Sequence, residues 1–458
     1  MTFPPPPDLA LTLARAVRDA GGRALVVGGW VRDALLNRAS KDLDLEVYGL
    51  AADPLRRLLE GFGRVDTTGA SFTVYKIGDL DVSIPRRDSK SGRGHRGFIV
   101  EGDPQLSPTD AARRRDFTIN AISWDPLSNE IVDPFDGRRD LGARMLRAVD
   151  HATFGDDSLR VLRALQFAAR FDLRLDEDTA ALCRTIPLDD LPCERVWGEV
   201  EKLLLRAERP SIGFALALDL GVIDRLFPEL RPLVGCPQDA LWHPEGDVWV
   251  HTLLVIDQAR QRIGDLDRGR AAAVMLGAVC HDLGKPATTA MSDGRVRSLG
   301  HEEAGVAPTL ALLDRLNVHS LDGYDVRRAV AGITAHHLKP GMFHKAPQPV
   351  SDGAFRRLAL KVDLELLARV AKADCLGRTG PFDCSAMDWF LERARALGVE
   401  HRPPAPIVLG RHLLELGLAP GPRVGETLRA IYERQLDGEI TTIDEGLTLA
   451  RTLLSSHT

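Results

Sequence analysis

The sequence predicts an α+β fold in which an N-terminal α/β head with an antiparallel or mixed sheet is followed by an all-helical body. Strand-like alternation and glycine turns are concentrated before about residue 140, and amphipathic helical spacing dominates after it. His, Asp and Gly motifs reappear at 251–374, and a proline-rich stretch precedes a last helical segment. We therefore expect a head at 1–140, a neck at 141–240, a helical module at 241–400 and a tail at 401–458.

The composition indicates an ordinary globular protein, with 44% hydrophobic and 27% charged residues in 458. The chain shows neither a secretory signal nor an apolar run long enough for a membrane span, so we expect no membrane partner. Six cysteines without a CxxC pair make no disulfide framework, which favours a reduced cytoplasmic protein. The net charge of −6 excludes a uniformly basic coat, so any nucleic-acid surface must be local. The oligomeric state is left open.

The first segments of the head have clear periodicity. Residues 23–27, RALVV, are typical of a short buried strand that ends at Gly28 and Gly29. WVRDALLN then predicts the first turns of a helix, and DLDLEVYGL alternates acidic and apolar residues as a strand does. FTVYKIGDLDVSIP (72–85) predicts a hairpin that turns near residue 78.

Two aspartates one residue apart open the DLDLEVYGL strand. Residues i and i+2 of a strand point to the same side, so Asp42 and Asp44 project together while the leucines turn to the core. Adjacent carboxylates repel each other unless a cation joins them, and Mg²⁺ suits such a pair. Asp81, on a neighbouring predicted strand, is the candidate third carboxylate, ahead of Asp79 near the turn. The alternative is a solvated Asp-x-Asp at a strand end.

The glycine turn before these aspartates fits the same chemistry. Gly28 and Gly29 would let backbone N–H groups approach a triphosphate at a helix N-terminus, and Arg32 could add charge-assisted hydrogen bonds. Two divalent ions about 3.5–4 Å apart can activate a hydroxyl and hold a leaving pyrophosphate. The alternative for the glycines alone is an ordinary turn.

The stretch GGWVRDALLNRASKDLDLEV (28–47) resembles the active-site motif of class II nucleotidyltransferases of the DNA polymerase beta superfamily, namely tRNA CCA-adding enzymes and bacterial poly(A) polymerases. Four later motifs follow in the family's order: RRRDFTINAISWDP (113–126), DPFDGRRDLGARMLRAV (133–149), GDDSLRVLRALQFAARFDLRL (155–175) and CERVWGEVEKLL (193–204). The resemblance covers roughly the first 205 residues and implies addition of nucleotides to an RNA end without a template.

The resemblance also implies roles for single residues. Asp42 and Asp44 would bind the catalytic metals, and the second motif would contact ribose and phosphates, although its basic run alone is equally typical of a solvated surface. The implied nucleotide-binding residues are Gly28, Gly29, Arg32, Arg114, Arg115, Asp116, Asn120, Asp157, Arg160 and Arg163.

The fourth motif carries a base-selection hypothesis. Asp157 and Arg160, spaced i and i+3 on one expected helix, would share a face. A carboxylate can accept from the exocyclic amine that cytosine and adenine share, and a guanidinium can donate to the ring nitrogen beside it. The alternative is a surface ion pair. This chain has Asp156 where the family usually has Glu, so Arg160 can be positioned differently.

The segment RRDSKSGRGHRG (86–97) matches the flexible loop that takes part in the family's switch to adding A, and it carries six basic residues, counting His95. Its presence argues against an enzyme restricted to C addition, because such members tend to have a shortened loop. The alternative is a disordered surface loop.

Imidazole and carboxylate side chains recur in the helical half, and together they suit Mn²⁺, Fe²⁺, Ni²⁺, Zn²⁺ or Mg²⁺. The sequence HDLGK resembles the HD phosphohydrolase superfamily. That resemblance implies His251, His281, Asp282 and Asp374 as core metal ligands, with His301 and either His336 or His337 as auxiliary ligands.

Some bacterial CCA-adding enzymes carry such a domain, which implies phosphatase or 2′,3′-cyclic phosphodiesterase activity on RNA ends. A bound metal such as Mn²⁺, Ni²⁺ or Mg²⁺ would lower the pKa of water for attack on a phosphate ester. The alternative is a degenerate helical domain that only shapes a tRNA-binding body. The Gly/Pro turn of the tail (401–458) could contact RNA phosphate, but an ordinary turn between helices is the simpler interpretation.

We therefore expect a tRNA nucleotidyltransferase that uses CTP, ATP and Mg²⁺, with a second metal-dependent hydrolytic centre. Three alternatives remain at this point. The chain could be a poly(A) polymerase, an enzyme that adds only CC or only A, or chiefly an HD phosphohydrolase with an inert RNA-binding head.

Overall fold

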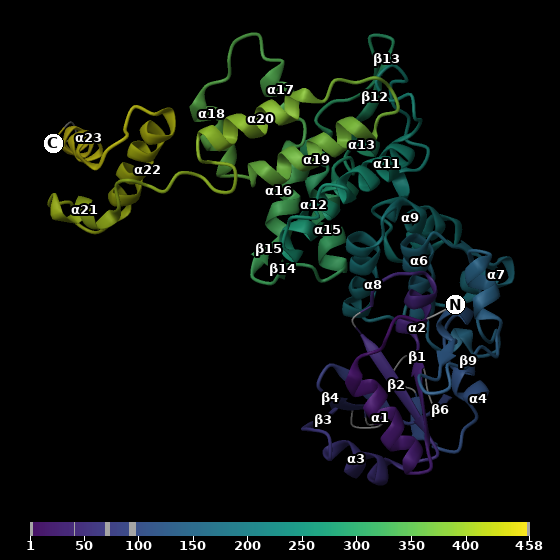
Figure 1. The fold of residues 1–458 in the computed structure, drawn as a ribbon. Helices are drawn as coiled ribbons and strands as arrows, with labels where there is room; N and C mark the ends of the chain where they lie inside the picture. The colour runs from purple at the N-terminus through teal and green to yellow at the C-terminus, as the bar shows by residue number, and fades with distance from the viewer. Residues whose placement is uncertain (1–2, 41, 69–73, 91–97, 456–458) are drawn as a thin grey trace. The chain divides into compact units, whose positions relative to one another are not determined.

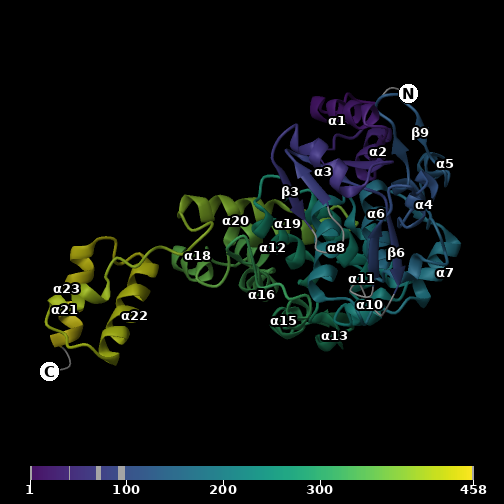
Figure 2. The same cartoon turned by 90° about the horizontal axis from the view of Figure 1, so that it is seen from below.

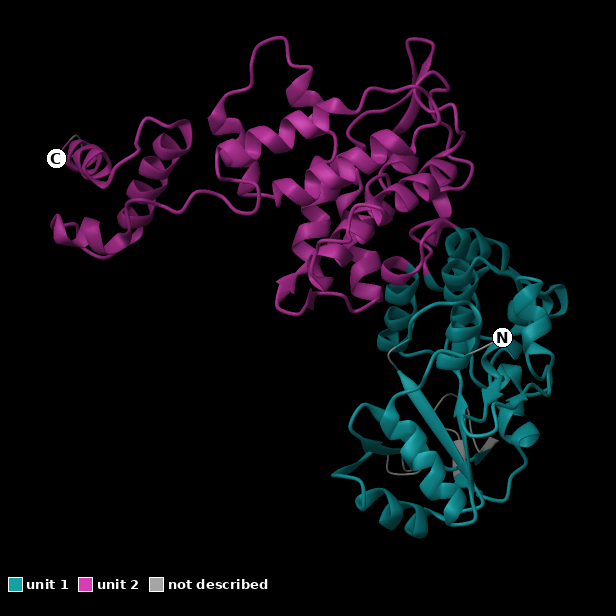
Figure 3. Ribbon diagram, in the orientation of Figure 1, with its two compact units in different colours: residues 1–203, 212–226 teal, residues 204–211, 227–458 magenta. Residues whose placement is uncertain are grey.

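The computed structural model describes residues 3–40, 42–68, 74–90 and 98–455 (Figure 1). The chain divides into two units: unit 1 comprises residues 1–203 and 212–226, and unit 2 comprises residues 204–211 and 227–458 (Figure 3). The sequence analysis divides the chain into four segments instead of two units, and the boundaries of those four segments stay a prediction. Within the described ranges, the apolar helices are all too short or too polar to cross a bilayer.

Unit 1 is built on a seven-stranded sheet of order β3-β4-β5-β2-β1-β8-β9. The central strands are β1 (Arg23–Val27), β2 (Leu43–Tyr48) and β5 (Leu80–Ser83). β2 runs antiparallel to β1 and parallel to β5, so the sheet is mixed, as predicted. The outer strands are β3 (Val65–Thr68), β4 (Val74–Ile77), β8 (Ser123–Trp124) and β9 (Ile131–Val132).

The alternation within β2 decides which side chains enter the core. Leu43, Leu45 and Val47 are buried in one apolar cluster with side chains of α1 (Asp8–Asp19) and α3 (Ala52–Glu60). Because successive side chains of a strand alternate, the acidic residues of the same stretch turn to the opposite side. The predicted hairpin after β3 is present as β4 and β5, although residues 72–73 at its start lie outside the described residues.

The basic segment at 86–97 differs from the expected loop. Its first residues form β6 (Arg86–Lys90), which pairs antiparallel with β7 (Phe98–Gly102), and residues 91–97 between them lie outside the described residues. Backbone pairing between residues that flank a Gly/Ser/Arg-rich stretch is not visible in the composition of that stretch, which is why the strand was missed.

Helices make up most of the remaining chain, as predicted. Unit 1 contains α2 (Gly29–Leu35), α4 (Pro108–Arg113), α5 (Gly137–Gly142), α6 (Leu159–Phe171), α7 (Glu177–Thr185) and α10 (Val222–Leu226), while α8 (Cys193–Arg206) and α9 (Pro210–Asp219) cross the boundary between the units. Helix α6 lies within the fourth motif, and α8 contains the fifth.

Unit 2 contains the other helices: α11 (Val248–Arg260), α12 (Arg268–Cys280), α13 (Lys285–Thr288), α14 (His301–Ala304), α15 (Val306–Arg315), α16 (Val326–His336), α17 (Lys339–His344), α18 (Asp352–Ala359), α19 (Leu364–Gly377), α20 (Ser385–Ala396), α21 (Gly410–Glu415), α22 (Pro422–Asp437) and α23 (Ile443–Ser455). Side chains from α12 are buried on every face. The last three helices gather around an apolar cluster of their own (Figures 1 and 2).

The helical body also contains short β pairs that the sequence analysis did not predict. They are β10 (Met145–Leu146) with β11 (Arg174–Leu175), β12 (Thr289–Ser292) with β13 (Arg295–Ser298), and β14 (Ser320–Leu321) with β15 (Tyr324–Asp325). Two of the turns are Asp-Gly pairs with positive φ at both positions, Asp293-Gly294 and Asp322-Gly323. Asp-Gly favours a tight hairpin turn, so this local signal was present in the sequence and was overlooked.

Candidate active sites

The three candidate carboxylates of unit 1 meet on neighbouring strands. Asp44 lies directly opposite Asp81 in the parallel pairing of β2 with β5, and Asp42 immediately precedes β2. Asp42 and Asp44 are exposed, and Lys76 Nζ lies 3.5 Å from the Asp81 carboxylate. Partial desolvation, followed by the charge of Asp81, raises the pKa of Asp44. A carboxylate that is held beside other carboxylates, and whose ionisation they oppose as at Asp44, makes a site that a divalent cation fits.

The backbone of Gly28 borders this site. Its φ of +72° is a conformation that side-chain-bearing residues rarely adopt. A Cβ at this position would lie 3.2 Å from Arg115 Nη1 and 3.9 Å from Asp44 Oδ2. Glycine therefore lets the turn before α2 approach both a carboxylate and a guanidinium, and Gly29 begins α2. The phosphate contact expected of this turn stays a prediction.

Arg32 is buried, and its guanidinium already has partners inside the protein. It donates to Asn120 Oδ1 at 2.6 Å and to Asp33 Oδ1 at 2.6 and 2.8 Å. Its Cζ also lies 4.3 Å from the centre of the Phe171 ring on α6. These contacts tie α2 to the second and fourth motifs, and the phosphate contact expected of Arg32 stays a prediction.

Asp116 is the centre of a buried polar network. Its Oδ1 accepts hydrogen bonds from Asn120 Nδ2 at 2.9 Å and from the backbone N–H of Phe117 at 2.8 Å. Its Oδ2 accepts from Arg163 Nε at 2.6 Å. Burial alone would raise the pKa of Asp116, but Arg163 and these hydrogen bonds outweigh burial and lower it. The carboxylate thus stays ionised and joins the second motif to α6.

Arg114 and Arg115 are anchored by a residue that the sequence analysis missed. Glu46 lies on β2 two residues after Asp44, and its Oε1 lies 2.8 Å from Arg114 Nη2 and 3.9 Å from Arg115 Nη2. Tyr48 donates a hydrogen bond to the other oxygen of Glu46 at 2.6 Å. The same i+2 spacing that picked out the aspartates could have identified Glu46 as a third acid on that side of the strand.

The structure corrects the local geometry expected of Asp157 and Arg160. Asp157 precedes α6, which begins at Leu159, so the two residues do not share the face of one helix. The Asp157 carboxylate pairs with Arg195 Nη2 at 3.0 Å, whereas Arg160 donates to the carbonyl oxygens of Thr153 and Arg114. Arg195, on α8, was missed because the fifth motif was matched as a pattern without roles for its residues.

Unit 2 brings most of the predicted metal ligands into one cluster. Potential ligand atoms converge in two overlapping triads, namely His251, His281 and Asp374, and Asp282, His301 and His337. His281 Nε2 lies 3.1 Å from Asp282 Oδ2, and His301 Nε2 lies 3.3 Å from Asp282 Oδ1. Between the triads, His251 Nε2 lies 3.9 Å from Asp282 Oδ2. Segments far apart in the sequence therefore supply one centre.

Each histidine of this cluster is held by its other ring nitrogen. Nδ1 of His251 lies 2.8 Å from Glu245 Oε1, while Nδ1 of His281, His301 and His337 lie 2.7 to 2.9 Å from the carbonyl oxygens of Ala278, Ser298 and Thr334. When Nδ1 donates to these acceptors, Nε2 is left as a lone-pair donor that faces the centre. Glu245 was not among the predicted residues. The one hint in the sequence was an acidic residue six positions before the candidate ligand His251.

Two tests support a cation at this cluster. Among the described residues, buried His281 Nε2 makes no hydrogen bond of good geometry, and buried Asp282 has one cation, Lys285, 2.7 Å from its Oδ2, while three imidazole Nε2 atoms also face its oxygens. Burial, followed by the charge of His281, lowers the pKa of His337 to about 4, so this ring is neutral at pH 7 and able to act as a ligand. The residues present therefore fit a divalent metal.

The positions of His336 and His337 indicate which of the two is the candidate auxiliary ligand. His337 is buried, and its Nε2 lies 3.2 Å from His301 Nε2 within the cluster. His336 is half-buried, joins none of the described groups of potential ligands, and its Nδ1 finds no partner among the described side chains and backbone. His337 is the candidate auxiliary ligand.

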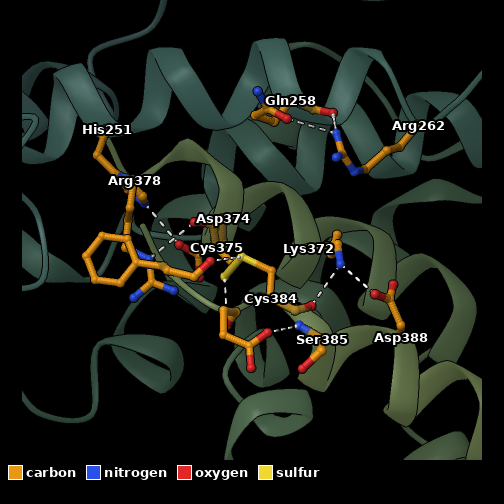
Figure 4. The surroundings of a disulfide bond; sticks show 12 residues. His251, Gln258, Arg262, Lys372, Asp374, Cys375, Arg378, Cys384, Ser385 and Asp388 are labelled. Atoms are coloured by element: carbon orange, nitrogen blue, oxygen red, sulfur yellow. Dashed lines mark hydrogen bonds and ion pairs between the residues drawn. A yellow bond between two sulfur atoms is a disulfide. The ribbon is translucent and has the colours of Figure 1, made fainter. Parts of the chain in front are cut away.

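One disulfide lies beside this cluster, contrary to the expectation of a fully reduced chain. Cys375 follows Asp374 on α19, and it is bonded to Cys384 at the start of α20 (Figure 4). Two cysteines nine residues apart match no recognised sequence motif. The two sulfur atoms meet only because the chain turns back between α19 and α20. Cys183, Cys193, Cys236 and Cys280 are free.

Comparison with family models matches two segments of the chain. Residues 24–147 match the poly A polymerase head domain, and residues 172–233 match a segment described as the probable RNA and SrmB-binding site of polymerase A. The first match contains all but the first residue of β1, together with β2, β5 and the second motif, which surround the carboxylate site.

Curated relatives resemble nearly the whole chain. The multifunctional CCA protein of Xanthomonas campestris pv. campestris (strain B100) is 36% identical over 419 residues, which cover 88% of this chain and 95% of that protein. The protein of the same name from Mannheimia succiniciproducens is 38% identical over 369 residues, covering 78% of this chain and 84% of that protein.

Solved structures share the fold at lower identity. The Bacillus stearothermophilus CCA-adding enzyme in complex with CTP is 22% identical, with a TM-score of 0.66 over 98% of this chain and 97% of that one. The Thermotoga maritima CCA-adding enzyme complexed with tRNA is 20% identical, with a TM-score of 0.57 over 98% of this chain and 95% of that one.

Proposed function

The chain belongs to the family of CCA-adding nucleotidyltransferases that includes the bacterial multifunctional CCA proteins, and from this premise we propose that it adds C and A to the 3′ end of tRNA from CTP and ATP. The observation that carries the proposal is the placement of Asp44 opposite Asp81 and beside Gly28. Because tRNA, CTP and ATP are cytoplasmic, we place this reaction in the cytoplasm.

The reaction is a phosphoryl transfer in which the 3′ hydroxyl oxygen of the RNA forms a bond to the α-phosphorus of the nucleotide. The bond from that phosphorus to the bridging oxygen breaks, pyrophosphate leaves, and the hydroxyl proton passes to solvent. Asp42 and Asp44, with Asp81 as a third candidate, would hold Mg²⁺, which when bound neutralises charge on the phosphates and favours ionisation of the hydroxyl.

The chain's own side chains would orient the nucleotide. Arg115 lies against the Gly28 turn, and Glu46 fixes Arg114 and Arg115 on the carboxylate side of β2. These cations suit a triphosphate that is bound next to the acids. Asp157 and Arg160 stay the proposed base-selecting residues, with Arg195 holding the carboxylate of Asp157.

Sequencing of reaction products tests this function. Purified protein is incubated with tRNA transcripts that lack one, two or three nucleotides of the 3′ CCA end, together with CTP, ATP or both. The proposal expects restoration of CCA and no further growth. A homopolymeric A tail would instead identify a poly(A) polymerase, and products that stop after CC or start only from CC would identify a partial enzyme.

A second proposed activity belongs to unit 2, where the histidine cluster supports metal-dependent hydrolysis of a phosphate ester. The convergence of anchored imidazoles on the carboxylate of buried Asp282 favours this activity over a degenerate domain. His251, His281, Asp282 and Asp374 would hold the ion, such as Mn²⁺, Ni²⁺ or Mg²⁺, and His301 and His337 would assist. When bound, the ion lowers the pKa of water.

Release of inorganic phosphate from RNA ends that carry a 2′-phosphate, measured with each metal in turn, tests the hydrolytic activity. A companion assay opens 2′,3′-cyclic phosphate ends. Protein that holds a stoichiometric metal yet releases no phosphate and opens no cyclic end would show that the domain only shapes the body of the molecule.

A further inference from the structure

A cavity of about 480 Å³ opens onto the histidine cluster of unit 2. Asp282, His301, His337 and Asp374 line it together with side chains that no metal would need, notably Trp242 and Arg378. A metal ion with its water fills a small part of such a volume. The rest of the cavity is therefore large enough to hold the group that carries the phosphate.

The additional lining includes an unusually exposed aromatic residue. Trp242 is 48% exposed and stacks with Phe382, their ring centres 6.4 Å apart and their planes 23° from parallel. An indole at the mouth of a cavity, supported by a second ring, presents a flat surface on which a planar heterocycle can stack. Most tryptophans that serve only the core are buried more completely.

Two cations accompany these rings. Lys345 Nζ lies 5.8 Å from the centre of the Trp242 ring, and Arg378 Cζ lies 4.3 Å from the centre of the Phe382 ring. Both cationic side chains line the cavity, and both lie outside the histidine cluster. Lys285 is different, because its Nζ lies 2.7 Å from Asp282 Oδ2 and donates to Gln238. The mouth of the cavity thus combines aromatic faces with positive charge, the combination that binds single nucleotides.

The segment that bears Arg378 and Phe382 is held at both ends. The disulfide between Cys375 and Cys384 closes it (Figure 4). Within it, the backbone N–H of Thr379 donates to Glu245 Oε2 at 3.3 Å. Glu245 is also the acceptor for His251 Nδ1. The same carboxylate therefore connects the position of this segment to the position of a candidate metal ligand.

We propose that Trp242, supported by Phe382, is a base-stacking residue that selects nucleotides as the substrates of the histidine cluster. The proposal rests on the hydrolytic function proposed above. The terminal base of an RNA stacks on Trp242, Lys345 and Arg378 bind its backbone phosphate, and the ester to be cleaved reaches the cluster. Phosphates without a planar base lack this interaction and bind more weakly.

Two substrates that differ in the base test the proposal. Adenosine 2′-monophosphate and glycerol 2-phosphate both carry a phosphate on a secondary alcohol, but only the first has a heterocycle. Trp242→Ala should raise KM for adenosine 2′-monophosphate about tenfold, leave its kcat unchanged, and leave both constants for glycerol 2-phosphate unchanged. Trp242→Phe should restore most of the lost affinity. Leu241→Ala, at a neighbouring side chain that is 70% exposed and does not line the cavity, should change nothing.

A binding measurement separates this proposal from the hydrolytic function. Isothermal titration of metal-stripped protein with adenosine 2′-monophosphate should show about tenfold weaker binding for Trp242→Ala than for the unmodified chain. Binding of the same ligand by unit 1 is common to both proteins and cancels in the comparison. If neither substrate is hydrolysed but the affinities differ, hydrolysis fails and the nucleotide subsite stands. Equal affinities, or an equal loss for both substrates, would overturn the subsite.

Discussion

The two candidate sites hold acidic side chains in opposite ways. In unit 1, Asp42 and Asp44 are exposed at the start of a strand, and partial desolvation, followed by the charge of Asp81, raises the pKa of Asp44. In unit 2, Asp282 is buried, and His281 and Lys285 hold its pKa well below its ordinary value although burial opposes them. In the first site a neighbouring like charge opposes ionisation of Asp44, whereas in the second Lys285 already offsets the charge of Asp282.

This difference indicates how each site would acquire its ion. Exposed carboxylates without fixed neighbours bind Mg²⁺ weakly, and Mg²⁺ that arrives with a nucleotide brings additional phosphate ligands. Imidazoles that are anchored through Nδ1 lose little freedom when they bind a metal, so the cluster of unit 2 can retain its ion between turnovers. We therefore expect unit 1 to exchange its ion and unit 2 to keep it.

The largest expected effect separates the two sites completely. Asp44→Asn should lower nucleotide addition by about a thousandfold or more, because it removes a charge that would hold the catalytic metal, while phosphate release stays unchanged. Asp282→Asn should have the reverse effect. Addition to a tRNA that lacks its terminal A and phosphate release from an RNA 2′-phosphate are measured on the same preparations. Asp79→Asn, at the exposed turn beside β5, is the matched control for unit 1. Loss of both activities in either variant would contradict the separation.

The second prediction concerns metal retention and uses two neighbouring histidines. His337→Gln should weaken metal affinity by at least about tenfold, because the ring that faces the cluster is replaced. His336→Gln should retain the metal, since His336 joins none of the described ligand groups. Metal content after dialysis against a chelator, determined by elemental analysis, gives the comparison. Equal metal loss in the two variants would mean that the ring of His337 does not bind the ion.

The predictability of the two regions differs for physical reasons. Strands β1, β2, β4 and β5 of unit 1 were predicted because local periodicity and glycine turns specify them; β1, for example, covers the five expected residues. The partners of Asp157 were not predictable in the same way. A spacing of i and i+3 implies a shared face only inside a helix, and the helix begins two residues after Asp157.

The residues that were missed share one property, which is that they act through another side chain. Glu46, Arg195 and Glu245 position predicted residues, and although Glu46 and Arg195 lie inside matched motifs, only three-dimensional contact reveals what they hold. The disulfide was missed for a related reason, because Cys375 lies on α19 and Cys384 lies outside that helix, just before α20. Convergence of the histidines was predicted, since every expected ligand type occurred in order. The choice between adjacent His336 and His337 could not be made from the sequence, because it depends on which side chain faces the cluster where α16 ends.

A smaller effect is expected from Arg195, which holds the carboxylate of Asp157. Arg195→Ala should allow about tenfold more misincorporation of U or G relative to C and A, because a mobile carboxylate discriminates less well between an amine and a carbonyl. Single-nucleotide competition on a tRNA that lacks CCA, with sequencing of the products, measures the ratio. Arg206→Ala, at an exposed position of the same helix, serves as the control. Unchanged selectivity alongside a lower kcat would show that Arg195 supports the fold rather than base choice.

The smallest effect is expected from opening the disulfide of unit 2. Cys384→Ser, or reduction with dithiothreitol, should raise KM for adenosine 2′-monophosphate by about threefold, because Arg378 and Phe382 lose one of the two anchors of their segment. Nucleotide addition should not change, since its proposed residues belong to unit 1. Cys193→Ser, which removes a free thiol, should respond to dithiothreitol as the unmodified chain does. A count of free thiols before and after reduction shows whether the bond was present. If the bond opens and KM stays constant, the hydrogen bond from Thr379 to Glu245 is sufficient to position the segment, and the closing of the chain at Cys375 serves only the packing of α19 against α20.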